Sequence, residues 1–190
     1  MIKEKQGKIL VNFARKTIKK FLTGKKITVP SNYYEVFEEK RGVFVTLEEY
    51  PSGDLRGCIG LPYPEKTLIK SVEDAAISAS RDPRFPPLDI KELDKITVEV
   101  SVLTEPEKIE FEIPEQLLKK IKVGEDGLIL KKDFRSGLFL PQVWEKLPDK
   151  KEFLENLSYK AGLKNPDAWK SADIFKFQVQ AFKEKEPGKI

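Results

Sequence analysis

The sequence predicts an α+β fold in which a largely antiparallel sheet is flanked by helices. Stretches with a helical spacing of apolar residues and stretches of strict alternation follow one another in an irregular order. Several of the alternating stretches are joined by short turns, which is typical of hairpins. The chain has 190 residues, enough for one domain or two small lobes with a substantial core. We expect a single domain over residues 1–190, with a second, smaller α/β lobe at about 108–145 and a cleft between the two.

Three stretches are predicted to form the main helices. Residues 3–23 carry apolar pairs at every third to fourth position with lysines between them, and Gly24 follows as a stop. Residues 65–80 have an apolar stripe that becomes rich in small residues, and residues 151–161 have a second amphipathic pattern. A shorter helix is expected at 114–120, where proline occupies the first position.

The strands are predicted from alternation of apolar and polar residues. Residues 43–48 and 55–60 alternate on either side of a Pro-Ser-Gly-Asp turn, so they are expected to form a hairpin. Residues 96–104 show the clearest alternation of all. Further strands are expected at 109–113, at 121–123 and 128–131 as a second hairpin, at 138–140 and at 174–182.

The one cysteine of the chain lies in the second strand of the first hairpin, within the hexapeptide LRGCIG at residues 55–60. In an extended strand Arg56 and Cys58 point to the same face, about 7 Å apart at their Cα atoms. A cation at that distance favours the thiolate, which is the reactive form of cysteine. Gly57 and Gly60 allow a backbone or a ligand to approach closely. The alternative is a buried structural cysteine in a tightly packed strand.

A stiff, charged segment follows the second helix at residues 81–87. Three prolines restrict its backbone, and it carries two arginines beside Asp82. Such arginines can be aimed at a cleft, or they can cap the C-terminus of the preceding helix, where cations are favourable. We assign Arg81 to the cap and Arg84 to the cleft.

Polar residues also interrupt the strand at 96–104. Glu99 and Ser101 share one face of it, and a buried glutamate needs a partner, so we predict that Glu99 pairs with Arg56 or Arg84. Alternatively, Glu99 lies on the solvent face of an antiparallel sheet. Gln142, just after a proline, is a candidate amide for the cleft.

The hexapeptide LRGCIG at residues 55–60 resembles the signature of the AMMECR domain family, which has no settled molecular function. Four other segments resemble that family in the expected order, and together they cover nearly the whole chain: residues 42–47, 82–88, 98–104 and 137–143. The resemblance implies the family's fold. It also implies a partnership with Memo-like or radical S-adenosylmethionine proteins, because domains of this family are found fused to them or encoded beside them.

The composition excludes several classes of site. The chain has no histidine and one cysteine, which rules out catalytic triads built on histidine, histidine-based zinc sites and iron–sulfur clusters. An oxygen-ligand metal site is still possible, but no spacing of carboxylates indicates one, so we expect no metal and no cofactor. The 35 basic and 31 acidic residues are interspersed and leave a net charge of +4, so nucleic-acid binding is not expected. The abundance of lysine and glutamate, with one methionine, is typical of proteins from hot environments.

The same residue types leave two functions open. The chain is either an enzyme that acts through Cys58 or a binding module for a small anionic ligand or a peptide, with an adaptor role as a form of the second. The candidate catalytic residues are Cys58, Arg56 and Glu99. The candidate ligand-binding residues are Arg56, Gly57, Gly60, Asp82, Arg84, Ser101 and Gln142. We expect the protein to be cytoplasmic, since no apolar run approaches the roughly 20 residues of a membrane span and the N-terminus lacks the apolar core of a signal peptide.

Overall fold

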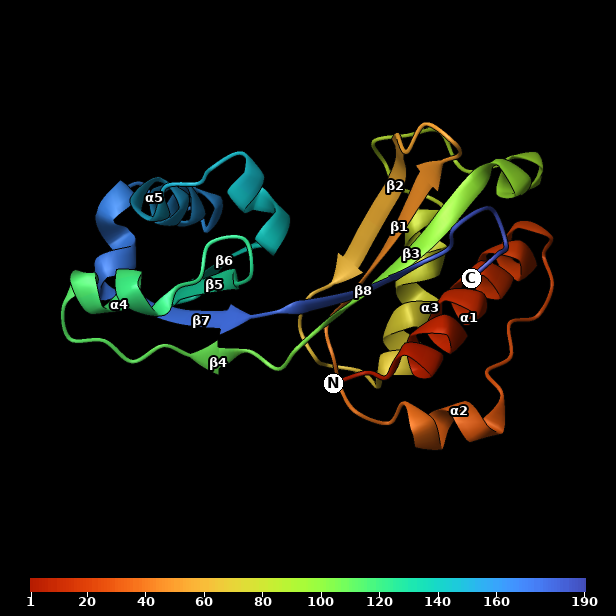
Figure 1. The fold of residues 1–190 in the computed structure, drawn as a ribbon, viewed down its shortest axis with the longest axis horizontal. Helices are drawn as coiled ribbons and strands as arrows, with labels where there is room; N and C mark the ends of the chain where they lie inside the picture. Colours follow the sequence, from red (N-terminus) through yellow and green to blue (C-terminus); the bar gives the residue numbers. More distant parts are fainter. The chain divides into compact units, whose positions relative to one another are not determined.

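The computed structural model describes residues 1–190 and divides into two compact units (Figure 1). Unit 1 consists of Met1–Leu103 together with Gln180–Ile190, and unit 2 consists of Thr104–Val179. The region at about 108–145, where a smaller lobe was expected, lies inside unit 2.

Unit 1 is built on a four-stranded sheet with the order β2-β1-β3-β8. Its strands are β1 (Val43–Glu49), β2 (Leu55–Leu61), β3 (Ile96–Leu103) and β8 (Val179–Lys183). Strand β1 is antiparallel to both of its neighbours, β2 and β3. The helices of this unit are α1 (Glu4–Leu22), α2 (Ser31–Val36) and α3 (Leu68–Ala79), with a short 3₁₀ helix, η1 (Ile90–Lys95), before β3.

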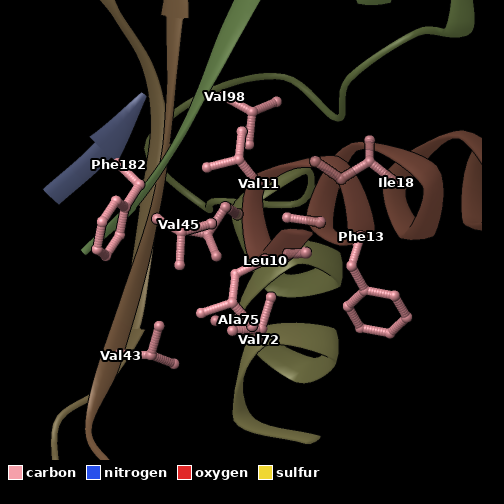
Figure 2. Packing of buried hydrophobic residues seen from close by; sticks show 14 of the residues in the cluster. Leu10, Val11, Phe13, Ile18, Val43, Val45, Val72, Ala75, Val98 and Phe182 are labelled. Carbon is pink, nitrogen blue, oxygen red and sulfur yellow. The ribbon is translucent and has the colours of Figure 1, made fainter. Parts of the chain in front are cut away.

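The core of unit 1 lies between one face of this sheet and the helices α1 and α3 (Figure 1). Figure 2 shows Val43 and Val45 of β1 among the apolar side chains of both helices. Because side chains alternate along a strand, the residues between them point to the opposite face of the sheet. Gly7 lets α1 pack closely here, since a Cβ at that position would lie 2.0 Å from the ring of Phe182.

Unit 2 holds a second four-stranded sheet, with the order β4-β7-β5-β6. Its elements are β4 (Glu107–Lys108), α4 (Pro114–Lys120), β5 (Gly127–Lys132), β6 (Arg135–Phe139), η2 (Pro141–Glu145), α5 (Lys150–Lys160), η3 (Pro166–Ser171) and β7 (Asp173–Phe177). The core of the unit includes Trp144, whose ring stacks on Phe153 with centroids 3.6 Å apart.

The α+β class and the antiparallel pairing predicted from the sequence are confirmed. The helices expected at 3–23 and 151–161 are found within two residues at each end, and the one expected at 65–80 begins three residues later, at Leu68. The hairpin of residues 43–48 and 55–60 is also present. No helix combines the length and the hydropathy needed to cross a lipid bilayer.

Three predicted strand arrangements are wrong. The continuous alternation at 174–182 is split at Gln178, so that β7 belongs to the sheet of unit 2 and β8 to that of unit 1. Residues 121–126 form a turn instead of half a hairpin, because the Asp126 carboxylate accepts the Lys122 backbone N–H at 2.9 Å. The true hairpin pairs β5 with β6, through a tip at Asp133 and Phe134. Residues 109–113, expected as a strand, contain none.

Candidate functional site

The LRGCIG strand, β2, is an edge strand with one irregularity. Its register with β1 shifts between Leu47 and Glu48, because Arg56 is an extra residue on the β2 side. A β-bulge of this kind bends the strand and re-aims the side chain at the bulge. The simple alternation that placed Arg56 beside Cys58 therefore does not apply at this position.

The Arg56 guanidinium is held by a partner that sequence analysis did not select. Its Nε and Nη2 donate to the two Glu92 carboxylate oxygens at 2.9 and 3.1 Å, and Nη2 also donates to the Pro86 carbonyl at 3.0 Å. The hydrogen bonds from Arg56 lower the pKa of Glu92. Glu92 in turn accepts the backbone N–H of Asp89 at 2.7 Å and so completes the N-terminal cap of η1. Arg56 thus joins the bulge of β2 to η1.

Asp82 and Arg84 together cover the outer edge of β2 at Cys58. The Asp82 carboxylate accepts the Cys58 backbone N–H at 2.9 Å, and Arg84 Nη2 donates to the Cys58 carbonyl at 3.1 Å. Asp82 also accepts three bonds from Arg84, from its backbone N–H and from Nε and Nη2, at 2.7 to 3.1 Å. The two side chains supply the acceptor and the donor that a neighbouring strand would otherwise provide.

The environment of Asp82 fixes its ionised form. Asp82 is 2% exposed. The side-chain hydrogen bonds from Arg84, helped by backbone N–H donors, hold the pKa of Asp82 well below its usual range despite burial. Arg84 has a raised pKa for the same reason, although 57% of its side chain is exposed. This ion pair, buried on the Asp82 side and exposed on the Arg84 side, holds the segment at 81–87 against β2.

Cys58 itself faces a row of polar side chains. Because its backbone N–H and C=O point outward to Asp82 and Arg84, Cys58 and Thr46 form a non-hydrogen-bonded pair, in which facing side chains lie closest. The Thr46 hydroxyl donates to the Cys58 sulfur at 3.3 Å. On the other side of Thr46, the facing residue is Glu99 of β3. Cys58, Thr46 and Glu99 are all half-buried.

We use the term polar face for the side of the unit 1 sheet opposite α1 and α3. Its side chains occupy register positions that face one another across β2, β1 and β3, or across β1 and β3 alone, and they are Phe44, Thr46, Glu48, Cys58, Gly60, Thr97, Glu99 and Ser101. Glu48 forms an ion pair with Lys183. The Ser101 hydroxyl donates to Glu99 at 3.0 Å. Gly60 lies under the ring of Phe44, where a Cβ would come within 2.1 Å of that ring. Gly57 meets the Ala79 carbonyl on the helix side, where a Cβ would come within 2.5 Å of the oxygen.

Metal ligands are not gathered anywhere in the chain. No group of three or more cysteine, aspartate or glutamate side chains is placed to hold a metal ion.

Comparison with known proteins identifies the family. The AMMECR1 family model matches residues 11–182, which is most of the chain. The chain belongs to the AMMECR1 family. Protein MJ0810 of Methanocaldococcus jannaschii is 50% identical over 190 residues, covering 96% of this chain and 92% of that protein. Protein PYRAB00100 of Pyrococcus abyssi is 48% identical over 198 residues, covering 98% and 94%. The crystal structure of the uncharacterised protein PH0010 from Pyrococcus horikoshii superposes with a TM-score of 0.86 at 46% identity, covering 100% of this chain and 96% of that one.

The AMMECR1 signature thus brings some of the predicted residues together and leaves others apart. Asp82 and Arg84 meet Cys58, through its backbone. The predicted pairing of Glu99 with Arg56 or Arg84 is wrong, because each arginine binds another carboxylate. Ser101 lies beside Glu99 on the polar face. Gln142 is an exposed residue of η2 in unit 2.

Two residues of this AMMECR1 site were not selected from the sequence, although each had a signal. Thr46 alternates onto the same face as its hairpin partner Cys58, so pairing the two strands would have indicated it. Glu92 stands three residues after Asp89, which is the spacing of a capping box. Neither pattern predicts that Glu92 also binds Arg56. Both patterns are local, and this contact joins residues that are 36 positions apart in the sequence.

Proposed function

We propose that the polar face of unit 1 is a ligand-binding site, and that Cys58 shapes this site without acting as a nucleophile. One observation carries the proposal. Arg56 is paired with Glu92 and Arg84 with Asp82, so the charge of each guanidinium is already balanced by a carboxylate. The polar side chains of this face that have no ion-pair partner are the hydroxyls of Thr46, Thr97 and Ser101, the Cys58 thiol and the Glu99 carboxylate, whereas Glu48 is paired with Lys183.

The chemistry of these groups defines the ligand class. The row Cys58–Thr46–Glu99 offers hydrogen-bond acceptors and one negative charge. Adjacent strands are about 4.8 Å apart, so the row spans about 10 Å from Cys58 to Glu99. A matching ligand carries hydrogen-bond donors or a positive charge, such as an ammonium group on a small molecule or on a peptide side chain. This ligand class differs from the anionic ligand expected from the sequence, which stays a prediction.

The strand that carries Cys58 is held from two sides without a ligand. The Asp82–Arg84 pair fixes the backbone of Cys58 from outside the sheet, while close packing at Gly57 fixes the strand against α3. Preorganisation of this kind lowers the entropy that a ligand must lose on binding. The role of the signature residues in this proposal is therefore to hold the polar face in place.

Nucleophilic catalysis by Cys58 is a second candidate. It is favoured by the Thr46 hydroxyl, which donates to the sulfur at 3.3 Å and would stabilise charge there. A role as an adaptor beside Memo-like or radical S-adenosylmethionine proteins stays a prediction.

The sign of the potential at the site can be tested with two alkylating reagents. The labelling rate of native Cys58 with each reagent is divided by the rate of the same reagent with N-acetylcysteine. We expect this relative rate to be higher for neutral iodoacetamide than for anionic iodoacetate. A charge about 10 Å away contributes about 0.4 to 0.8 kcal/mol at effective dielectric constants of roughly 80 to 40, or about a twofold to fourfold preference. Glu99→Gln should remove this preference. Glu4→Gln, at an exposed position of α1 on the opposite side of the sheet, should leave it unchanged.

Binding is separated from catalysis by a titration with n-butylammonium followed by amide NMR. We expect saturable shifts in β1, β2 and β3, retention of these shifts in Cys58→Ser, and their loss in Glu99→Gln. Butyrate should produce none. A preference for iodoacetate in the labelling experiment, or for butyrate in the titration, would contradict the proposal and would indicate that the site binds anions.

A further inference from the structure

A pocket lies on the helical side of unit 1, away from the polar face. It has a volume of about 170 Å³ and is lined by the second half of α1, by the segment 27–30 and by Tyr33 of α2. We call it the α1–α2 pocket.

The spacing along α1 gives the pocket a charged side. Asn12, Lys16 and Lys20 are four residues apart, so their side chains lie above one another on one stripe of the helix. No aspartate or glutamate is among the lining residues. Lys20 Nζ donates to the Thr28 hydroxyl at 3.0 Å, which leaves its charge uncompensated. Two lysines at this spacing repel each other, and an anion placed between them would relieve that repulsion.

The other side of the pocket is aromatic and apolar. Phe13 and Tyr33 pack edge to face with centroids 6.0 Å apart, and Ile27 and Pro30 complete the wall. An apolar cavity of about 150 Å³ takes up a benzene ring in a well-studied lysozyme variant, so the volume here suits a single ring.

A buried polar group inside the lining is left without a protein partner. Thr17 is 1% exposed, and its hydroxyl makes no hydrogen bond within the chain. Threonine hydroxyls in helices usually bond to the backbone one turn earlier, and buried polar groups are seldom left unsatisfied. A rotation of the Thr17 side chain would bring this hydroxyl to the pocket, where a ligand with an acceptor oxygen would supply the missing partner.

We propose that the α1–α2 pocket binds a small monocyclic carboxylate, with the ring on Phe13 and Tyr33 and the carboxylate between Lys16 and Lys20. This ligand has the opposite charge to the one proposed for the polar face, so the two sites are distinct in place and in chemistry. The positive side, the aromatic side and the unpartnered hydroxyl each match one part of the same ligand.

The test is an amide NMR titration of the full chain with benzoate. We expect saturable shifts confined to residues 12–20 and 27–33. Benzamide, which has the ring without the charge, and inorganic phosphate, which has charge without a ring, should each bind at least about tenfold more weakly. Lys16→Gln and Lys20→Gln should each weaken benzoate binding by about threefold to tenfold, as expected for the loss of one charged contact. Thr17→Val, which keeps the shape of the side chain, should weaken binding while the protein stays folded.

The matched control is Lys19→Gln, which removes a lysine of the same helix that does not line the pocket. It should leave the affinity for benzoate unchanged. Equal affinities for benzoate and benzamide, or for benzoate and phosphate, would overturn the proposal. So would equal effects of Lys19→Gln and Lys16→Gln, or the absence of any saturable shift with benzoate.

Discussion

Replacing Asp82 by asparagine should destabilise unit 1 by about 2 to 3 kcal/mol. The carboxylate accepts four hydrogen bonds, three from Arg84 and one from the Cys58 backbone. An asparagine keeps one oxygen, so two of these donors would face an amide NH₂ that cannot accept. Each such loss at a buried site costs about 1 to 1.5 kcal/mol. The total stays below the cost of breaking a fully buried ion pair, because Arg84 is largely exposed and can turn to water.

The measurement is guanidinium chloride unfolding followed by far-UV circular dichroism. Tryptophan fluorescence provides a second probe, since Trp144 and Trp169, the two tryptophans of the chain, belong to the core of unit 2. We expect the circular dichroism midpoint to fall in Asp82→Asn. The fluorescence midpoint should fall with it only if the two units unfold in one transition.

Asp89→Asn is the matched control for this substitution. Asp89 is an exposed N-cap residue of η1, and its side chain accepts the backbone N–H of Lys91 at 2.8 Å. Asparagine caps as well as aspartate does, so the change should stay within about 0.5 kcal/mol of the wild type. An Asp82→Asn variant as stable as Asp89→Asn would refute the claim that the Asp82 carboxylate anchors the edge of β2.

Three further predictions follow from the same structure. Glu184→Gln should lower the free energy of unfolding, measured by thermal or chemical unfolding, by about 3 kcal/mol. The Glu184 side chain is 0% exposed and binds both an arginine of α1 and the backbone of β3. Gly57→Ala should lower the free energy of unfolding by about 1 to 3 kcal/mol, because the added methyl meets a backbone carbonyl. Gly60→Ala should lower it less, because there the methyl meets a ring that can move. Equal unfolding midpoints of the two variants would contradict this. The pKa values of Asp82 and Glu92 are lowered in the folded state, so the stability that these carboxylates contribute is complete above their unfolded-state pKa values of about 4 and is lost as the pH falls below them. A titration of the unfolding free energy with acid should show this loss. The loss should be smaller in Asp82→Asn.

The elements that could be predicted from the sequence are those with a local cause. The helix at 3–23 and the strand at 96–104 follow from the spacing of their own apolar residues, which reflects 3.6 residues per helical turn and alternation in a strand. The first hairpin follows from its turn residues. The run at 174–182 shows where this method fails, because its alternation continues through Gln178 while its pairing partner changes from one sheet to another.

The candidate site divides in the same way. The residue types could be listed from the sequence: one thiol, no imidazole, Arg56 two residues before the thiol, Arg84 in the stiff segment at 81–87, and a polar face on each of two strands. The sequence could not determine which carboxylate each arginine binds. Arg56 had several acidic side chains within reach in principle, and the bulge in β2 directed it to Glu92 rather than to Glu99. The tertiary structure decided these pairings, because an ion pair forms between groups that folding brings together, and a one-residue bulge is enough to change which groups those are.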